Sequence, residues 1–316
     1  MQSTSTIVYF KQGLGNLILL TPTLQALAQM DESKKIDICL SSEWNDYRRN
    51  AFDEYISGMP FVQNIVNFPV QQFTKKYTVW FYTAHSEHSD ALDVFRSHDT
   101  INLSIPDWKM SMSHEAVWYF EHVLAMGYDK SMPDMYIPVK QTENIHVLPD
   151  NKLKIGLCNG TFCNMMKGAK QWPYFKELAE ALKNYYECNI ITIGTGDELQ
   201  EVKADFNFVD KLRFLDSANI INQLDLFIVN DTANMHVGDA LHVNMIAIFG
   251  GSFLSKNAPL SSTTCVVRKN LDCQPCQSTE SFKNCEKNTC LTSLTIGDVF
   301  SVCERKLNWI IKNEKY

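Results

Sequence analysis

The sequence predicts an α/β protein of two domains, each with a parallel sheet, on three observations. Short β-branched and aromatic runs alternate with apolar or amphipathic helical segments along the chain. This alternation begins at 6–10 and begins again at 154–158, after a polar stretch at 142–152. The chain has 316 residues, enough for two ordinary domains with separate hydrophobic cores. We therefore expect an N-terminal domain at 1–150 and a C-terminal domain at 151–316.

The first half contains four candidate strands and a turn with two glycines. The strands are expected at 6–10, 36–40, 62–67 and 77–82, and the helices at 17–29 and 43–56. Gly13 and Gly15 suggest a dinucleotide fingerprint, but Ile18 stands where G-x-G-x-x-G needs its third glycine. A Rossmann dehydrogenase is therefore disfavoured. The helix at 17–29 is expected to be interrupted at Thr21-Pro22, because proline lacks the N–H that an inner turn uses.

A polar cluster follows the strand at 77–82. His85, Glu87 and Asp90 lie just beyond its carboxyl end, where α/β folds place their chemistry. These three are our candidates for a proton acceptor. The alternative is a polar loop that caps a helix at 91–95.

The stretch at 225–251 organises the second half, where two apolar runs flank a helix expected at 233–241. Asp231 and Thr232 suit a helix N-cap, and a helix N-terminus presents backbone N–H groups to an anion. A strand end, a polar turn and a helix start together predict a phosphate site at the carboxyl end of a sheet. The alternative is a simple Asp–Thr cap with His236 in the core. The other elements of this half are strands at 154–158, 189–193, 226–229 and 245–249, and helices at 174–186, 218–224 and 296–311.

Three motifs carry a resemblance to a known family. Asp231, Thr232 and His236 spell D-T-x-x-x-H before an apolar strand and F-G-G-S. Lys170-Gln171-Trp172-Pro173 spells K-x-W-P before a helix, and Gly15-Asn16 opens the first helix. With these motifs in this order, the chain resembles glycosyltransferase family 9, the ADP-heptose:lipopolysaccharide heptosyltransferases and their relatives. The resemblance implies the GT-B fold, in which two Rossmann-like α/β domains face each other across a cleft.

The resemblance also implies a nucleotide-diphosphate sugar as donor, bound by the C-terminal domain. Lys170 corresponds to a lysine that contacts donor phosphate in relatives, and Lys167 is a second candidate. Glu198, or else Asp197, would accept hydrogen bonds from the ribose hydroxyls. Lys170→Ala and Asp231→Ala are expected to weaken stabilisation by nucleotides and to change the unliganded melting temperature little. The full donor-binding set is Gly15, Thr161, Lys167, Lys170, Glu198, Asp231, Thr232, Asn234 and His236.

The chain departs from the family at Asn16. In relatives the residue after this glycine is an acid that is proposed to be the general base. An amide cannot accept a proton at neutral pH, although it can hydrogen-bond a hydroxyl or a phosphate. Either His85, Glu87 or Asp90 replaces the missing base, or the protein does not catalyse transfer.

Two main hypotheses for function follow. The first is a glycosyltransferase that moves a sugar to a hydroxyl of a glycan, a protein or another acceptor, with inversion as the family implies. The alternative is a catalytically degenerate protein of the same fold that binds a nucleotide sugar or glycan without turnover. A sugar-nucleotide epimerase is a third interpretation. The sequence does not identify the sugar, the nucleotide or the acceptor.

Four cysteines gather in a polar loop at 273–290, and family members carry a similar C-x-P-C segment. Cys273, Cys276, Cys285 and Cys290 have the number of ligands that a tetrahedral zinc or iron site needs. We expect a structural metal there; the alternative is four free thiols. Transfer itself is expected to need no cofactor, because Lys170, helix dipoles and backbone N–H groups can offset the diphosphate charge.

Composition excludes several other classes of protein. The formal net charge of −7 argues against general nucleic-acid binding, which needs many phosphate-neutralising Lys and Arg side chains. No apolar stretch approaches the roughly 18–20 residues that a membrane span needs. The N-terminal residues have no basic region followed by an apolar run, as a signal peptide would. We therefore expect a cytoplasmic location and reduced thiols.

Overall fold

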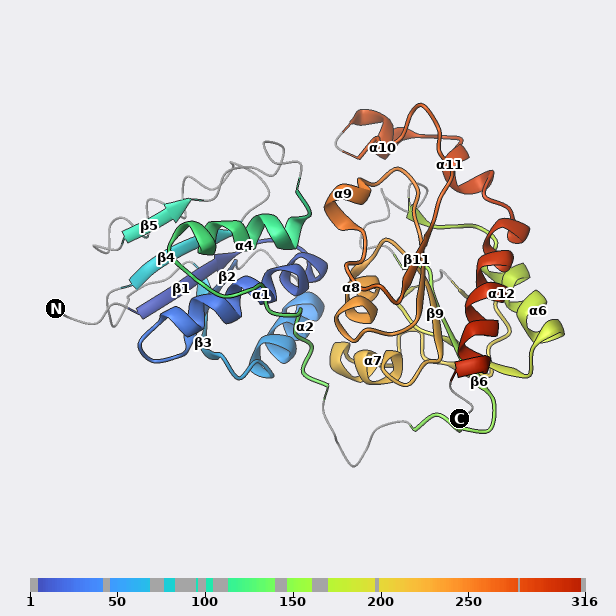
Figure 1. Ribbon diagram of the computed structural model, residues 1–316, viewed down its shortest axis with the longest axis horizontal. Helices are drawn as coiled ribbons and strands as arrows, with labels where there is room; N and C mark the ends of the chain where they lie inside the picture. Colours follow the sequence, from blue (N-terminus) through green and yellow to red (C-terminus); the bar gives the residue numbers. More distant parts are fainter. Residues whose placement is uncertain are drawn as a thin grey trace. The chain divides into compact units, whose positions relative to one another are not determined.

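The computed structural model describes residues 5–41, 46–68, 77–82, 95, 101–104, 113–139, 147–160, 170–196, 199–277 and 279–313. The chain divides into two compact units, Met1–Pro138 and Val139–Tyr316, each with its own sheet (Figure 1). Each unit is described below by itself.

The first unit contains a five-stranded sheet in which every pair of neighbouring strands is parallel. Its strands are β1 (Ser5–Phe10), β2 (Ile36–Ser41), β3 (Val62–Phe68), β4 (Tyr77–Tyr82) and β5 (Ile101–Ser104), in the order β3-β2-β1-β4-β5. The central strand β1 is buried from Ile7 to Phe10, as expected for a parallel strand with both faces covered. The strand order reverses between β1 and β4, and in such sheets ligands bind beyond the carboxyl ends of the strands at that point.

The helices of this unit are α1 (Leu14–Met30), α2 (Asp46–Ser57) and α4 (Glu115–Ala125). Helices α1 and α4 pack side by side (Figure 1). The predicted interruption of α1 at Thr21-Pro22 is wrong, because the helix continues through Pro22. The Thr21 hydroxyl donates a 2.7 Å hydrogen bond to the Ile18 carbonyl, which Pro22 cannot satisfy. The same hydroxyl accepts from the Tyr136 N–H at 2.9 Å, so a contact distant in sequence supports the helix here.

The second unit contains a six-stranded parallel sheet in the order β11-β10-β9-β6-β7-β8. Its strands are β6 (Leu153–Cys158), β7 (Cys188–Thr192), β8 (Phe206–Asn207), β9 (Leu226–Asn230), β10 (Met245–Ile248) and β11 (Thr264–Val267). Counted from β6, this order repeats that of the first sheet and adds one edge strand. Both sheets therefore have Rossmann-like order, and the reversal in the second falls between β6 and β9.

Helices cover both faces of the second sheet. They are α6 (Phe175–Tyr185), α7 (Phe214–Ile221), α8 (Ala233–Ala240), α9 (Leu254–Asn257), α10 (Glu280–Asn284), α11 (Thr289–Thr292) and α12 (Ile296–Asn313). Helices α7 and α8 pack together on one face, and α6 and α12 pack together on the other (Figure 1). Gly156 in β6 permits close packing on the sheet, because a Cβ there would lie 2.2 Å from Leu224 Cδ1. In the part of the chain that the structure describes, no helix is long and apolar enough to cross a membrane.

Candidate functional site

The candidate site lies where β6 and β9 end side by side in the second sheet. Cys158 and Val229 form the last residue pair between β6 and β9. Asn159-Gly160 follows β6, and Asn230-Asp231 lies at the end of β9. These segments are thus at the carboxyl edge of the sheet and at its point of reversal, as the sequence predicted for a phosphate site.

An ion pair between Lys170 and Asp231 is at the centre of this edge. Lys170 Nζ lies 2.8 Å from Asp231 Oδ2, and their side chains are 17% and 5% exposed. The Ser252 hydroxyl donates to the same carboxylate oxygen at 2.5 Å. Burial raises the pKa of Asp231, but the Lys170 ammonium, hydrogen bonds from Lys170 and Ser252 and the nearby His236 together hold that pKa below its usual value. Asp231 is therefore an anion at neutral pH.

Two buried asparagines fix the segment that carries Lys170 to both strand ends. Asn230 Nδ2 donates to the carbonyls of Gly160 and Lys170 at 2.8 and 3.2 Å. Asn159 pairs with the backbone of Trp172, accepting from its N–H at 3.1 Å and donating to its carbonyl at 3.0 Å. The sequence analysis did not include Asn159 or Asn230 in the donor set. The sequence did contain a signal for these two residues. Each asparagine stands at the end of an apolar strand, where a buried side-chain amide needs hydrogen-bond partners.

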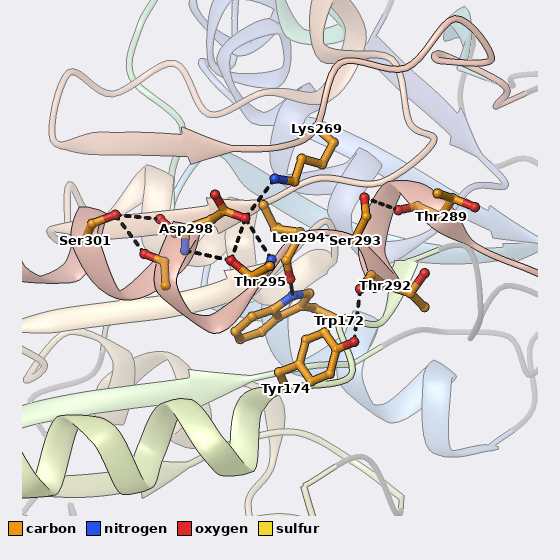
Figure 2. A network of polar contacts seen from close by, with 11 residues as sticks. Trp172, Tyr174, Lys269, Thr289, Thr292, Ser293, Leu294, Thr295, Asp298 and Ser301 are labelled. Atoms are coloured by element: carbon orange, nitrogen blue, oxygen red, sulfur yellow. Dashed lines mark hydrogen bonds and ion pairs between the residues drawn. The ribbon is translucent and has the colours of Figure 1, made fainter.

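Trp172 and Tyr174 anchor the same segment from the other side, as Figure 2 shows. Trp172 is fully buried, and its Nε1 donates to the Leu294 carbonyl at 2.8 Å. The Tyr174 hydroxyl donates to the Thr292 carbonyl at 3.0 Å. The tryptophan of the K-x-W-P motif therefore positions Lys170 by packing. Pro173 directly precedes Tyr174, the N-cap of α6.

Helix α8 begins next to the ion pair. Thr232 occupies the N-cap position, as predicted, but its side chain makes no capping hydrogen bond. Lys170 and Ser252 both contact Oδ2 of the Asp231 carboxylate. His236 is 5% exposed, and Asn234 Nδ2 donates to Cys158 Sγ at 3.3 Å. A part-exposed cation beside the start of a helix is an arrangement that can bind a phosphate.

The other predicted site residues are distributed as follows. Thr161, Lys167 and Glu198 lie outside the described residues, and so do His85, Glu87 and Asp90. Their predicted roles therefore stay predictions. Gly15 and Asn16 lie in the first turn of α1, in the first unit.

Asn16 contacts a buried carboxylate that the sequence analysis missed. Asn16 Nδ2 donates to Glu115 Oε1 at 2.5 Å, and the Tyr119 hydroxyl donates to the same oxygen at 2.6 Å. Glu115 is the first residue of α4 and only 2% exposed. The two residues are 99 positions apart, so no local pattern in the sequence connects them.

The cysteine loop is tied to the segment that supplies Ser252. The Cys276 N–H donates to the Gly251 carbonyl at 2.9 Å, and Gln274 Nε2 donates to the Gly250 carbonyl at 2.6 Å. A Cβ on Gly251 would lie 2.5 Å from Cys276 Sγ, so this contact needs a glycine. The hydrogen bonds of the second unit thus link the loop to Asp231 through Gly251 and Ser252.

The metal prediction for this loop is not tested by the positions of the thiols. None of the nine described cysteines forms a disulfide, and within the described ranges no three Cys, His, Asp or Glu side chains are close enough to hold a metal. Burial raises the pKa of Cys276 and raises that of Cys290 to about 11, and the neighbouring thiols of the cluster add to both shifts. The four cysteines therefore lie near enough to influence one another.

Comparisons with known proteins agree with this architecture. A family model described as glycosyltransferase family 9 (heptosyltransferase) matches residues 95–286. Lipooligosaccharide heptosyltransferase 2 of Campylobacter jejuni is 26% identical over 159 residues, which cover 45% of this chain and 49% of that protein. The chain thus spans about half the length of the curated relatives it matches.

Solved structures align over nearly the whole chain. ADP-heptose LPS heptosyltransferase II of E. coli has a TM-score of 0.69 and 15% identity, covering 99% of this chain and 100% of that chain. The iron-containing dodecameric heptosyltransferase TibC of enterotoxigenic E. coli, solved with ADP-D-beta-D-heptose, has a TM-score of 0.68 and 10% identity. That alignment covers 98% of this chain and 77% of TibC.

Two parallel sheets of Rossmann-like order, matched over their length by these enzymes, define a GT-B glycosyltransferase fold. The predicted fold class is confirmed. Because the family model matches more than half of its residues, the chain belongs to glycosyltransferase family 9.

Proposed function

We propose that this protein transfers a heptose-like sugar from ADP-heptose, or a closely related nucleotide-diphosphate sugar, to an acceptor hydroxyl. The observation that carries the proposal is Lys170, a part-exposed ammonium held by Asp231 at the carboxyl edge of β6 and β9. A cation beside the start of α8 suits a diphosphate. The related E. coli enzyme is named for ADP-heptose, and TibC was solved with ADP-D-beta-D-heptose, which supports this choice of donor.

The proposed reaction places a negative charge on the leaving diphosphate, and the site must stabilise it. The acceptor oxygen bonds to the anomeric carbon while the bond to the diphosphate breaks, and the electron pair leaves with the diphosphate oxygen. Lys170 and the first amides of α8 would stabilise the charge that develops on this leaving group. Attack from the face opposite the leaving group inverts the anomeric configuration. The site therefore needs no metal to offset the diphosphate charge in this proposal.

Turnover distinguishes this proposal from a degenerate binding protein. We expect the protein to release ADP from ADP-heptose when heptose-deficient lipooligosaccharide is supplied, and the acceptor mass to increase by one heptose. Product NMR reports the anomeric configuration, and inversion is expected. Stabilisation by ADP-heptose without ADP release would instead support the degenerate protein, because a ligand that binds only the folded state raises its stability whether or not it reacts.

We also propose a structural metal, zinc or iron, held by Cys273, Cys276, Cys285 and Cys290. Four thiolates are a donor set typical of either metal, and TibC is an iron-containing relative by name. Raised pKa values of Cys276 and Cys290 favour neutral thiols, and a bound cation would stabilise the thiolates instead. The metal would hold the loop against Gly251 and so support Ser252, with no part in the transfer step.

The metal proposal predicts about one metal ion per chain in protein purified under reducing conditions. Iron would give a visible thiolate absorption and zinc would leave the protein colourless. Cys273→Ser/Cys276→Ser should lose the metal and melt at a lower temperature. The matched control is Cys265→Ser, a thiol in β11 outside the cluster, which should keep the metal. Wild-type protein free of zinc and iron would contradict the proposal.

A further inference from the structure

Sugar transfer to a hydroxyl releases a proton, and a buried carboxylate of the first unit is one kind of group that could accept it. In its described residues three carboxylates are buried, namely Asp31, Asp37 and Glu115 at 8%, 1% and 2% exposure. Their positions in the sheet differ. Alpha/beta folds bind ligands beyond the carboxyl ends of the strands. A carboxylate at that edge of the sheet can therefore serve the reaction, whereas one at the opposite edge is expected to be structural.

Asp31 and Asp37 both lie toward the amino end of the sheet. Asp31 accepts from the N–H of Thr6, the second residue of β1, at 2.9 Å. Asp37 is the second residue of β2 and accepts from Asn64 Nδ2 and the Tyr77 hydroxyl at 2.9 and 2.8 Å. These bonds hold strands and their connections together, at the edge of the sheet opposite to the carboxyl ends of the strands.

Glu115 is instead bound to the segment that follows the carboxyl end of β1. Its partner Asn16 is in the first turn of α1, and Tyr119, which donates to Glu115, also lies 3.0 Å from Gln12 Oε1. Glu115 is in the first turn of α4, where the helix dipole stabilises a negative charge. Helix α1 has no titratable residue, and Lys11 and His114 precede the two helices. The other ionisable groups of α4 are Tyr119, Glu121 and His122.

The hydrogen bond also fixes how Asn16 is oriented. A carboxylate only accepts, so the Asn16 NH2 group must face Glu115. Asn16 Oδ1 then lies on the other side, 3.3 Å from where a Cβ on Gly13 would be. Asn16 is half-buried whereas Glu115 is buried, so the more accessible member of this pair offers a carbonyl oxygen that can accept from a hydroxyl.

We propose that Glu115 is the proton acceptor for the transfer reaction and that Asn16 binds the acceptor hydroxyl beside it. The inference rests on the proposed function. As the acceptor oxygen bonds to the anomeric carbon and the diphosphate leaves with its electron pair, the hydroxyl proton moves to a Glu115 carboxylate oxygen. Asn16 gives up its hydrogen bond to Glu115 to allow this transfer. The sugar, the diphosphate and the proton are then all accounted for.

Glu115→Gln tests this directly, because glutamine keeps an Oε1 that can accept from both Asn16 and Tyr119. Only the charge and the basicity are removed. With ADP-heptose and heptose-deficient lipooligosaccharide, we expect kcat to fall roughly 100- to 10,000-fold, the range typical of losing a general base. The melting temperature and the stabilisation by ADP should stay as in the wild type. The matched control is Glu121→Gln, the same change at an exposed position of α4, which should leave kcat unchanged.

Exchanging the two groups gives a second test. Asn16→Asp/Glu115→Gln keeps one amide and one carboxylate in hydrogen-bond contact, with the acid now on α1. We expect this variant to regain turnover to within about tenfold of the wild type, since a general base at either position can serve.

Several results would overturn the inference. One is wild-type kcat in Glu115→Gln, which would assign the proton to another group such as His114. A loss of ADP stabilisation equal to the loss of kcat would indicate a structural role. An exchanged variant as slow as Glu115→Gln would also count against the inference. A wild type that releases no ADP would overturn the proposed function itself, and this inference with it.

Discussion

Replacing Lys170 with methionine is expected to lower the free energy of unfolding by about 3–5 kcal/mol at pH 7, the usual cost of removing one partner of a buried ion pair. The reason is Asp231, which is 5% exposed and would keep its charge without the ammonium that balances it. Ser252 would remain as a hydrogen-bond donor but supplies no positive charge. Urea unfolding, followed by fluorescence, measures the change. The buried ion pair thus revises our expectation from the sequence, which was that replacing Lys170 would change the melting temperature of the unliganded protein little.

The loss of stability in Lys170→Met should depend on pH. In the wild type the pKa of Asp231 is lowered, so the stability it contributes is present above the unfolded value and is lost as the pH falls below it. Lys170→Met removes the largest of the interactions that offset burial, so the pKa of Asp231 should rise. The deficit should therefore be largest at neutral pH and shrink as the pH falls toward about 4. A deficit independent of pH would contradict this account.

A surface ion pair in the same unit is the control. Lys176 Nζ lies 3.6 Å from Glu201, with side chains 44% and 82% exposed. Lys176→Met should change the free energy of unfolding by no more than about 1 kcal/mol, as for other exposed pairs. An equal loss in the two variants would mean that burial of Asp231 is not the cause.

Removing both charges is expected to restore the stability that Lys170→Met loses and to weaken the binding of ADP. Lys170→Met/Asp231→Asn removes both charges of this ion pair, and the new amide can still accept from Ser252. Its stability should return close to that of the wild type. Its affinity for ADP should fall roughly 10- to 100-fold, because hydrogen bonds to charged groups contribute about 1.5–3 kcal/mol each. Calorimetric titration measures both proteins.

Adenosine is the control ligand for that titration. It lacks the diphosphate, so the double variant should bind it as the wild type does. A double variant that is folded and binds ADP with wild-type affinity would show that Lys170 does not contact the diphosphate.

Much of the fold was predictable because its signals are local. The runs that became β1, β4 and β9 are rich in β-branched or aromatic residues, and they form strands as predicted. The short strands β5 and β8 were not predicted, because a strand of four or two residues has no periodicity to read. The continuity of α1 was missed for a different reason. It depends on the contact between Thr21 and Tyr136, which sequence spacing does not show.

The site was predictable where chemistry follows a motif and unpredictable where it depends on tertiary contacts. Lys170 and Asp231 were identified separately by their motifs, and the structure brings them into contact. That they neutralise each other in a buried position could not be predicted, because burial is set by packing around Trp172 and Ser252. Glu115 gave no sign of function until α4 packed against α1 and placed it on Asn16.

Hydrogen–deuterium exchange with and without ADP tests the central claim most directly. Binding of the diphosphate at the carboxyl edge of β6 and β9 should slow exchange in peptides covering 170–175 and 230–236, and Lys170→Met/Asp231→Asn should lose that protection. ADP that binds the wild type but protects neither peptide would contradict the account.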